Sequence, residues 1–247
     1  MAAVALNQWN EAEPLAAPWI DHLGLVVADV APVVAALREA GFLVSDPQQL
    51  QGASGPMGQV SAHCVFPNGY LEISAPLPGA GNHLEPLLAQ GEGWRLLLFR
   101  TDDAETERQN LLQTGVRCSQ IDAASRQVRL DDRELTARFR WFSVPDLIPG
   151  ILTAYVEHCD PDVVFDASLC AHPNGATGLG AVLFGKEAQA LSKLPGGSTK
   201  DGPDALIASQ DEPAIAGLSV SGCPALHISS HSLNLAAFGE QTPWSQS

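Results

Sequence analysis

The chain has 247 residues, 45% of them hydrophobic, and its 28 acidic and 13 basic side chains give a net charge of −15. This composition predicts a globular protein of one large or two modest domains, with enough apolar residues for a packed core. The acidic balance argues against a nucleic acid or an anionic membrane as partner. Five cysteines without CxxC spacing indicate neither a disulfide framework nor a zinc knuckle. With no signal peptide and no membrane-spanning run, we expect a cytoplasmic protein.

Residues 18–80 predict a first module of one strand, one helix and three strands, after a loose lead-in at residues 1–17. A strand is predicted at residues 19–28, followed by a helix that Asp29 caps and Gly41 ends. Residues 42–44 start a short second strand, and residues 46–58, rich in Gln, Gly, Pro and Ser, are expected to form a loop. A Pro-Asn-Gly turn at residues 67–69 joins strands at 59–66 and 70–75 into a hairpin.

Residues 81–165 repeat this order of elements. A short helix at 83–90 precedes a buried-type strand at 94–100, a helix that residues 101–103 cap and Gly115 ends, strands near 126–130 and 134–142, and a last strand at 151–158. The only two tyrosines fall in matching places, in Tyr70-Leu71-Glu72 and Tyr155-Val156-Glu157. The repeated order and this match predict an internal duplication.

Residues 166–238 form a C-terminal extension. A strand is predicted at 174–184, a short helix at 186–194, and strand-length apolar runs occur at 205–209, 214–220 and 224–229. The extension could be a third, partial module that packs on the other two or completes a partner subunit. Residues 239–247 form a polar tail that we expect to fray.

Two strands of the first module each carry one polar residue that can bind a metal. His22 lies near the start of the strand at 19–28, and Glu72 lies within the strand at 70–75. Neighbouring strands of one sheet could bring both side chains to one face. Imidazole and carboxylate groups are common ligands of divalent metals, so this pair is a candidate metal site.

Four stretches of the chain resemble the glyoxalase-like branch of the vicinal oxygen chelate superfamily. They are DHLGLVVAD at 21–29, AGF at 40–42, NGYLEI at 68–73 and HPNGA at 172–176. The resemblance covers roughly residues 19–185 and implies an α+β fold, in which paired βαβββ modules form an open barrel of curled sheets. It also implies a divalent metal in the cleft, bound by side chains from the first and last strands of each module.

Carried over residue by residue, the resemblance makes His22 the first-strand ligand and Glu72 the last-strand ligand of the first module. In the second module Glu157 matches the last-strand ligand, with His158 beside it. Adjacent strand residues point to opposite faces, so only one of these two can face the metal unless a bulge intervenes. We assign His158 as the third ligand and Glu157 as the proton-transfer residue, and the opposite assignment stays open.

The first-strand ligand position of the second module falls on Arg95 or Leu96, and neither is a usual ligand. At most three matched ligands remain, which leaves positions for two substrate oxygens. The metal is expected to be Zn, Mn, Fe, Co or Ni. The residues expected to contact the substrate are His63, Arg95, Trp141 and His172. His172 also has a structural interpretation, as the side chain that ties down its Asn-Gly turn.

The activity that the resemblance implies is that of a divalent-metal-dependent lyase or isomerase. Such an enzyme chelates a small oxygenated metabolite through two oxygens and stabilises an enolate. Two alternatives stay open: a non-catalytic small-molecule-binding or resistance protein on the same fold, and an extradiol-type dioxygenase that uses non-haem Fe(II). The expected partners are a small-molecule substrate and a second copy of the chain in a homodimer.

Overall fold

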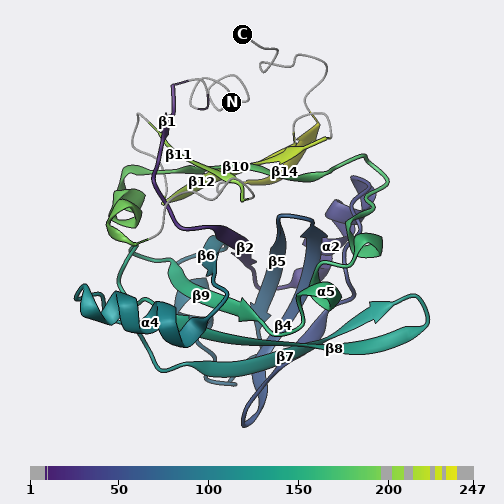
Figure 1. Ribbon diagram of the computed structural model, residues 1–247. Helices are drawn as coiled ribbons and strands as arrows, with labels where there is room; N and C mark the ends of the chain where they lie inside the picture. The colour runs from purple at the N-terminus through teal and green to yellow at the C-terminus, as the bar shows by residue number, and fades with distance from the viewer. Residues whose placement is uncertain are drawn as a thin grey trace.

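A computed structural model describes residues 9, 11–195, 202–208, 214–222, 226–229 and 232–237, the last two ranges for their backbone alone. Residues 1–8 and 10 of the expected lead-in, and the expected tail at 239–247, lie outside these ranges. Two layers make up the fold: a barrel of eight strands, and a six-stranded sheet that lies along one side of it (Figure 1).

The barrel consists of two βαβββ modules. The first contains β2 (Ile20–Val26), α2 (Val30–Glu39), β3 (Gln48–Gly52), β4 (Gly55–Phe66) and β5 (Gly69–Pro76). The second contains β6 (Gly93–Arg100), α4 (Ala104–Gln113), β7 (Asp122–Leu130), β8 (Arg133–Ser143) and β9 (Leu152–His158). The predicted α+β class and the pairing of modules are confirmed, and hydrogen bonds between β2 and β6 and between β3 and β7 close the barrel.

Local sequence signals set the ends of both barrel helices. The Asp29 side chain accepts a hydrogen bond from the Ala31 amide at the start of α2. Gly41, with φ of +80°, follows the helix in the left-handed conformation that glycine adopts without strain. Asp103 caps α4 in the same way, by accepting hydrogen bonds from the amides of Glu105 and Thr106.

The predicted strand at 42–44 and the predicted loop at 46–58 are both wrong. Residues 42–44 lie outside any strand, whereas β3 and the start of β4 occupy the expected loop. Gln49 pairs with Val60 of β4, and Gln51 pairs with Ser125 of β7. The backbone of β3 therefore has partners on both sides, and this tertiary pairing outweighs the weak strand propensity of its Gln-rich sequence.

Short helices connect the barrel strands and lead out of the barrel. They are α3 (Glu85–Leu88), α5 (Pro161–Val164) and the 3₁₀ helix η1 (Ala167–Cys170).

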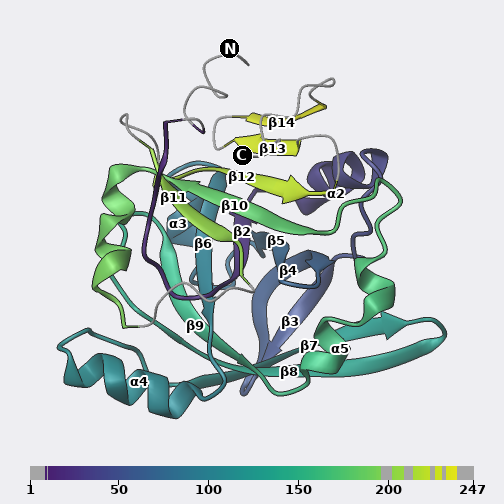
Figure 2. The ribbon, with the colours of Figure 1, turned by 45° about the horizontal axis from the view of Figure 1, so that its top comes forward.

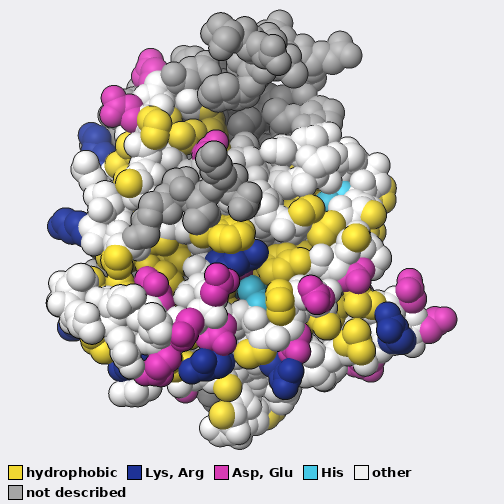
Figure 3. All heavy atoms as spheres, viewed as in Figure 1, with side chains coloured by type: hydrophobic (Ala, Val, Ile, Leu, Met, Phe, Trp, Pro, Cys, Tyr) yellow, Lys and Arg dark blue, Asp and Glu magenta, His cyan; other side chains and the backbone are white. Residues whose placement is uncertain are grey.

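Acidic and basic side chains lie side by side over α4, β7 and β8 on the face shown in Figure 3. A surface pocket of about 330 Å³ lies between α4, the start of β7 with the two residues before it, and Arg140 of β8.

The C-terminal extension forms the second sheet, with the order β1-β11-β10-β12-β13-β14 (Figure 2). Its strands are β1 (Glu13–Pro14), β10 (Gly178–Phe184), β11 (Asp204–Ile207), β12 (Ile215–Ser221), β13 (Leu226–Ser229) and β14 (Ser232–Ala237), and the 3₁₀ helix η2 (Lys186–Lys193) follows β10. In the barrel modules the first strand pairs in parallel with the last strand of its module. Here β10 pairs antiparallel with β12 and parallel with β11, so the strand order differs from that of a βαβββ module.

Asn68, in the hairpin turn between β4 and β5, joins the barrel to the second sheet. Its side-chain amide donates a hydrogen bond of 2.8 Å to the Leu179 carbonyl and accepts one of 2.9 Å from the Leu179 amide. Leu179 also packs into the apolar core that includes Leu23 and Ile73 of the barrel. The two layers therefore share one core and one side-chain link.

We predict that Asn68→Ala lowers the free energy of unfolding by about 1–3 kcal/mol, because it leaves both polar groups of Leu179 without their partner. Urea denaturation followed by circular dichroism measures the change. Asn110→Ala, within α4, is the control and should change this free energy by less than about 0.5 kcal/mol. Equal effects of the two substitutions would contradict the link.

Candidate functional site

Polar side chains of β2, β4 and β5 meet inside the barrel. His22 pairs with Tyr70 across β2 and β5, and His63 pairs with Glu72 across β4 and β5. The imidazole of His22 stacks on the Tyr70 ring, with centroids 4.1 Å apart, and His63 meets the same ring edge-on at 5.6 Å. Helix α2 packs with the apolar residues on the other face, including Leu71. The alternation of strand residues thus turns this polar set inward.

His22 lies between two buried carboxylates. Its Nδ1 is 2.7 Å from Oδ2 of Asp21, and its Nε2 is 3.5 Å from Oε2 of Glu72. The side chains of His22, Asp21 and Glu72 are 3%, 0% and 8% exposed. The other oxygen of Glu72 accepts hydrogen bonds from the hydroxyls of Ser61 and Ser74. Every carboxylate oxygen that faces this cluster therefore has a donor or the imidazole beside it.

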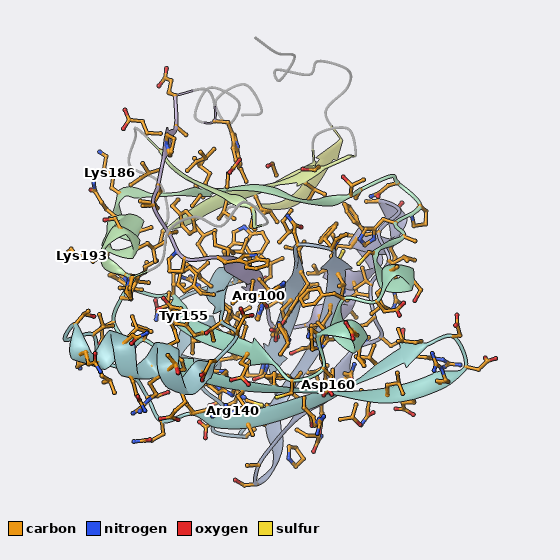
Figure 4. The ribbon with its side chains drawn as sticks, in the orientation of Figure 1. Arg100, Arg140, Tyr155, Asp160, Lys186 and Lys193 are labelled. Carbon is orange, nitrogen blue, oxygen red and sulfur yellow. The ribbon has the colours of Figure 1, made fainter. Side chains whose placement is uncertain are left out.

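Asp21 connects this cluster to the second module. It accepts a 2.6 Å hydrogen bond from Nε of Arg100, and Nε2 of His158 lies 3.1 Å from both of its oxygens. The register of β2 against β6 shifts between Ile20 and His22, so Asp21 lies in a β-bulge. A bulge re-aims side chains, which explains how Asp21 and His22 reach one cluster although they are adjacent. Arg100 lies near the middle of the molecule in Figure 4.

Hydrogen bonds and charges reverse the effect of burial on this cluster. Burial alone raises the pKa of Asp21, but the charge of His158 and the hydrogen bonds of His158 and His22 hold it well below its ordinary value. Burial also raises the pKa of Glu72, and His22 and His63 outweigh this and lower it. Burial lowers the pKa of His22, whereas Asp21 and Glu72 raise it above its ordinary value. The cluster therefore favours two carboxylates around a protonated His22.

Two further buried side chains face the cluster with polar atoms that lack partners. In the described part of the chain, Nδ1 of His63 and one terminal nitrogen of Arg126 are buried without a hydrogen-bond partner, and so is one nitrogen each of Arg100 and His158. Burial, together with the charge of Arg126, holds the pKa of His63 well below its ordinary value. The guanidinium of Arg126 lies 5.6 Å from the centre of the Tyr70 ring. His63 is therefore neutral at neutral pH, with a free ring nitrogen.

The structure does not bring Glu157 to this cluster. Its carboxylate accepts hydrogen bonds from the Ala104 amide at the start of α4, at 2.8 Å, and from Arg140, at 3.0 Å. Of the two adjacent residues, His158 turns inward and Glu157 turns to the helix. The ring nitrogen of His158 binds Asp21, however, so His158 does not join His22 and Glu72 as the expected third ligand. Strand alternation decides this placement.

Arg95 and His172, both expected to contact substrate, serve other contacts. Arg95 donates to the backbone carbonyls of Gln90 and Gly91, in the turn before β6. His172 accepts from the Leu43 amide at 3.0 Å through Nδ1 and lies 2.9 Å from the Val65 carbonyl through Nε2. Both ring nitrogens are thus used to tie the 172–176 segment to the barrel. This matches the structural interpretation of His172.

Trp141 remains a candidate substrate contact. Its ring lies 5.9 Å from that of His83. Burial lowers the pKa of His83, and the charge of Glu72 opposes this shift, which places His83 within electrostatic reach of the cluster. The contact of Trp141 with substrate stays a prediction.

Three site residues escaped the sequence analysis: Asp21, Arg100 and Arg126. Arg126 had a readable signal, since Ala124, Val128 and Leu130 occupy the same phase of β7 and are all buried. An arginine in the apolar phase of an alternating strand is rarely buried without a partner. No local pattern marks Arg100, whose role depends on the bulge in another strand.

The spacing of His22 and Glu72 fits two ligands of one metal ion. Two ligand atoms about 2.1 Å from a tetrahedral divalent ion lie about 3.4 Å apart, and Nε2 of His22 lies 3.5 Å from Oε2 of Glu72. Asp21 holds the opposite ring nitrogen, as carboxylates do for metal-bound histidines. Among the described residues, no group of three or more His, Cys, Asp and Glu side chains is arranged to hold a metal. The residues therefore fit a site with two protein ligands.

A family model described as the glyoxalase-like domain matches residues 20–194, which is more than half of the chain. The chain belongs to the glyoxalase-like family. This match confirms the resemblance to the vicinal oxygen chelate superfamily, from which the fold of paired βαβββ modules was predicted. A search among curated proteins found no match.

Solved structures place this glyoxalase-like chain among distant neighbours. A hypothetical protein from Staphylococcus aureus has a TM-score of 0.57 at 11% identity, over 76% of this chain and 85% of that one. Methylmalonyl-CoA epimerase from Mycobacterium tuberculosis has a TM-score of 0.42 at 21% identity, over 56% and 87%. The Streptomyces coelicolor methylmalonyl-CoA epimerase in complex with 2-nitronate-propionyl-CoA gives 0.41 at 21% identity, over 58% and 99%. The first of these supports the fold alone.

No helix in the described part of this glyoxalase-like chain is both long and apolar enough to cross a lipid bilayer.

The raised pKa of His22 predicts a pH-dependent contribution to stability. A group whose pKa is raised by folding stabilises the protein fully below its unfolded pKa, about 6.5 for histidine, and loses this contribution as the pH rises through the folded pKa. The free energy of unfolding of the wild type should therefore exceed that of His22→Gln by more at pH 6 than at pH 9. Urea denaturation of metal-free protein at both pH values measures the difference.

The comparison with His22→Gln removes the effect of His63, which is present in both proteins and acts in the opposite sense below pH 6.5. A difference between the two proteins that stays constant, or grows with pH, would contradict a protonated His22 between the carboxylates.

Proposed function

We propose that the chain is a divalent-metal-dependent lyase or isomerase that acts on a small oxygenated metabolite. The observation that carries this proposal is the arrangement of Asp21, His22 and Glu72, in which the outer carboxylate orients the imidazole and leaves Nε2 beside Glu72. Buried polar groups of this kind destabilise a fold unless they are satisfied, so a barrel interior built from them favours a functional role. Membership of the glyoxalase-like family supports the same reading.

His22 and Glu72 would hold the metal ion, with Asp21 fixing the orientation of the imidazole. Once bound, the ion would supply Lewis-acid stabilisation of negative charge on a substrate oxygen. Zn, Mn, Fe, Co and Ni all accept this donor set. Since His22 and Glu72 are at most 8% exposed, the substrate must displace side chains that cover them in order to enter.

His63 is the residue best placed to move a proton, in place of Glu157. It is neutral at neutral pH, and its Nδ1 has no partner among the described residues. In the tautomer that carries the proton on Nε2, Nδ1 can therefore accept a proton from a substrate carbon. It lies opposite Glu72 in the ladder and against Tyr70, on the same inward face as His22. Glu157 cannot take this role from its position, because its carboxylate binds the start of α4.

A non-catalytic binding protein is a second candidate. Two protein ligands are fewer than the three that most catalytic zinc sites use, and in the described part of the chain no larger ligand group occurs. A barrel with a polar interior could also hold a ligand without chemistry. The homodimer expected from the sequence remains a prediction for either function.

Metal content tests the proposed site. We expect purified protein, after reconstitution with Zn, Mn, Fe, Co or Ni, to hold about one equivalent of at least one of these metals, measured by mass spectrometry. His22→Gln and Glu72→Gln should each lower the metal affinity by about 10- to 100-fold or more, because each removes one of two ligands. His83→Gln, at the edge of the polar interior, is the matched control and should keep the metal.

Circular dichroism shows whether each variant remains folded. If the wild type takes up none of the five metals, the metal-dependent function fails. If metal is bound equally by folded His22→Gln and Glu72→Gln, the metal lies elsewhere.

Exchange of carbon-bound protons tests His63. In D₂O, the metal-loaded enzyme should exchange a carbon-bound proton of at least one acid in a panel of pyruvate, 2-oxobutyrate and lactate: a C3 proton of the two 2-oxo acids or the C2 proton of lactate. Proton NMR follows the loss of signal. His63→Gln should slow this exchange by about 100-fold or more, as expected for loss of a general base. His172→Gln is a control histidine outside the cluster. Ligand binding without any exchange would favour the non-catalytic alternative.

A further inference from the structure

Arg126 is a buried cation that has no counter-ion among the described residues. The residue is 4% exposed, and one of its terminal nitrogens is buried with no hydrogen-bond partner. Among the described residues, no carboxylate lies within 4 Å of its guanidinium. Eight such contacts of other arginines and histidines occur there, with the six carboxylates of Asp21, Asp46, Glu72, Asp146, Glu157 and Asp160. Arginine is almost never buried unless it is paired. This guanidinium therefore lacks the partner that its position requires.

The guanidinium of Arg126 faces the polar interior of the barrel. Its neighbours Ala124 and Val128 on the same phase of β7 are buried, and its guanidinium lies 5.6 Å from the centre of the Tyr70 ring. Glu72 and Asp21 are near enough to raise its pKa, against the lowering by burial, but too far to pair with it. The aromatic contact offsets only part of the free-energy cost of burying a charge.

Arg100 provides the contrast within the same barrel. Its Nε donates to Asp21 at 2.6 Å, and its guanidinium lies between the rings of Trp19 and Phe165, at 4.4 and 4.2 Å from their centres. The charge of Arg100 is therefore matched by a carboxylate of the protein itself. Arg126 has no such carboxylate partner among the described residues.

We infer that Arg126 binds the carboxylate of the substrate, and that the substrate of this site is a small organic acid. The inference rests on the proposed function, because it names the class of molecule that the same site accepts. A carboxylate supplies the single negative charge that Arg126 lacks and matches the planar fork of its guanidinium. Because the Arg126 guanidinium and the His63 ring both lie 5.6 Å from the centre of the Tyr70 ring, the reacting carbon would lie close to the carboxylate, as in 2-oxo and 2-hydroxy acids.

A purely structural role for Arg126 makes different predictions. If the guanidinium serves only to pack on Tyr70, its loss should lower stability and should not affect the choice between an acid and its amide. If it waits for an anion, the ligand-free protein carries an unmatched charge, and replacing Arg126 by methionine should leave the melting temperature of ligand-free protein unchanged or raise it. Both readouts can be measured without turnover.

The test is calorimetric titration of metal-free, EDTA-treated protein with lactate, pyruvate, acetate and malonate, and with lactamide as the neutral analogue of lactate. We expect at least one of the four acids to bind, and lactate to bind at least about tenfold more tightly than lactamide. Arg126→Gln and Arg126→Met should weaken acid binding by about 10- to 100-fold, and Arg126→Lys should restore part of it. Arg129→Gln, an exposed arginine three residues along β7, is the control and should bind like the wild type.

Three results would overturn the inference: none of the four acids binds, lactamide binds as well as lactate, or a folded Arg126→Gln binds acids like the wild type. The comparison of acid with amide uses the wild type alone, so it decides the question even if the variants do not fold. Because the protein is metal-free, failure of the proposed metal site leaves this result unaffected, and the two failures can be told apart.

Discussion

The buried carboxylate of Asp21 holds the two halves of the barrel together. It is fully buried and interacts with His22 beside it, with Arg100 at the end of β6 and with His158 at the end of β9. Burying a carboxylate costs on the order of several kcal/mol unless donors surround it, so these three strands must meet for the residue to be tolerated. The bulge in β2 follows from the same requirement, since a regular strand would turn Asp21 and His22 to opposite faces.

The two modules have the same topology, but the Tyr and Glu side chains of their last strands, β5 and β9, face different parts of the protein. In β5, Tyr70 and Glu72 face the interior and contact His22. In β9, Tyr155 stacks on Phe142 in the apolar core, and Glu157 caps α4. The matching Tyr-x-Glu sequences are therefore out of phase by one residue relative to the barrel interior. As a result the first module supplies most of the polar groups, and the second contributes His158, Arg100 and Arg126.

Electrostatic balance connects this architecture to function. Glu72 and Asp21 are surrounded by donors, and their lowered pKa values show that these donors outweigh burial. His63 and Arg126 differ, because among the described residues neither has a carboxylate within 4 Å. Each also has a buried nitrogen without a hydrogen-bond partner there, as Arg100 and His158 do beside Asp21. A folded protein rarely retains such groups inside its core unless a ligand uses them. Asp21 and Glu72, with their donors, thus stabilise the interior of the barrel, whereas His63 and Arg126 are the residues suited to bind a ligand.

Local sequence determined the ends of the barrel helices and the turn between β4 and β5, and it marked His22 and Glu72 as candidate ligands. Asp29, Gly41 and the turn before Tyr70 act through neighbours a few residues away, and alternation along a strand sets which residues share a face. The tertiary structure alone decided the rest: β3 forms because two other strands pair with it, the bulge at Asp21 aims that carboxylate at His158, and the phase of β9 turns Glu157 out. These outcomes depend on register and charge between strands that are distant in sequence. A pattern read along one segment carries no information about them, because a shift of one residue reverses every side chain.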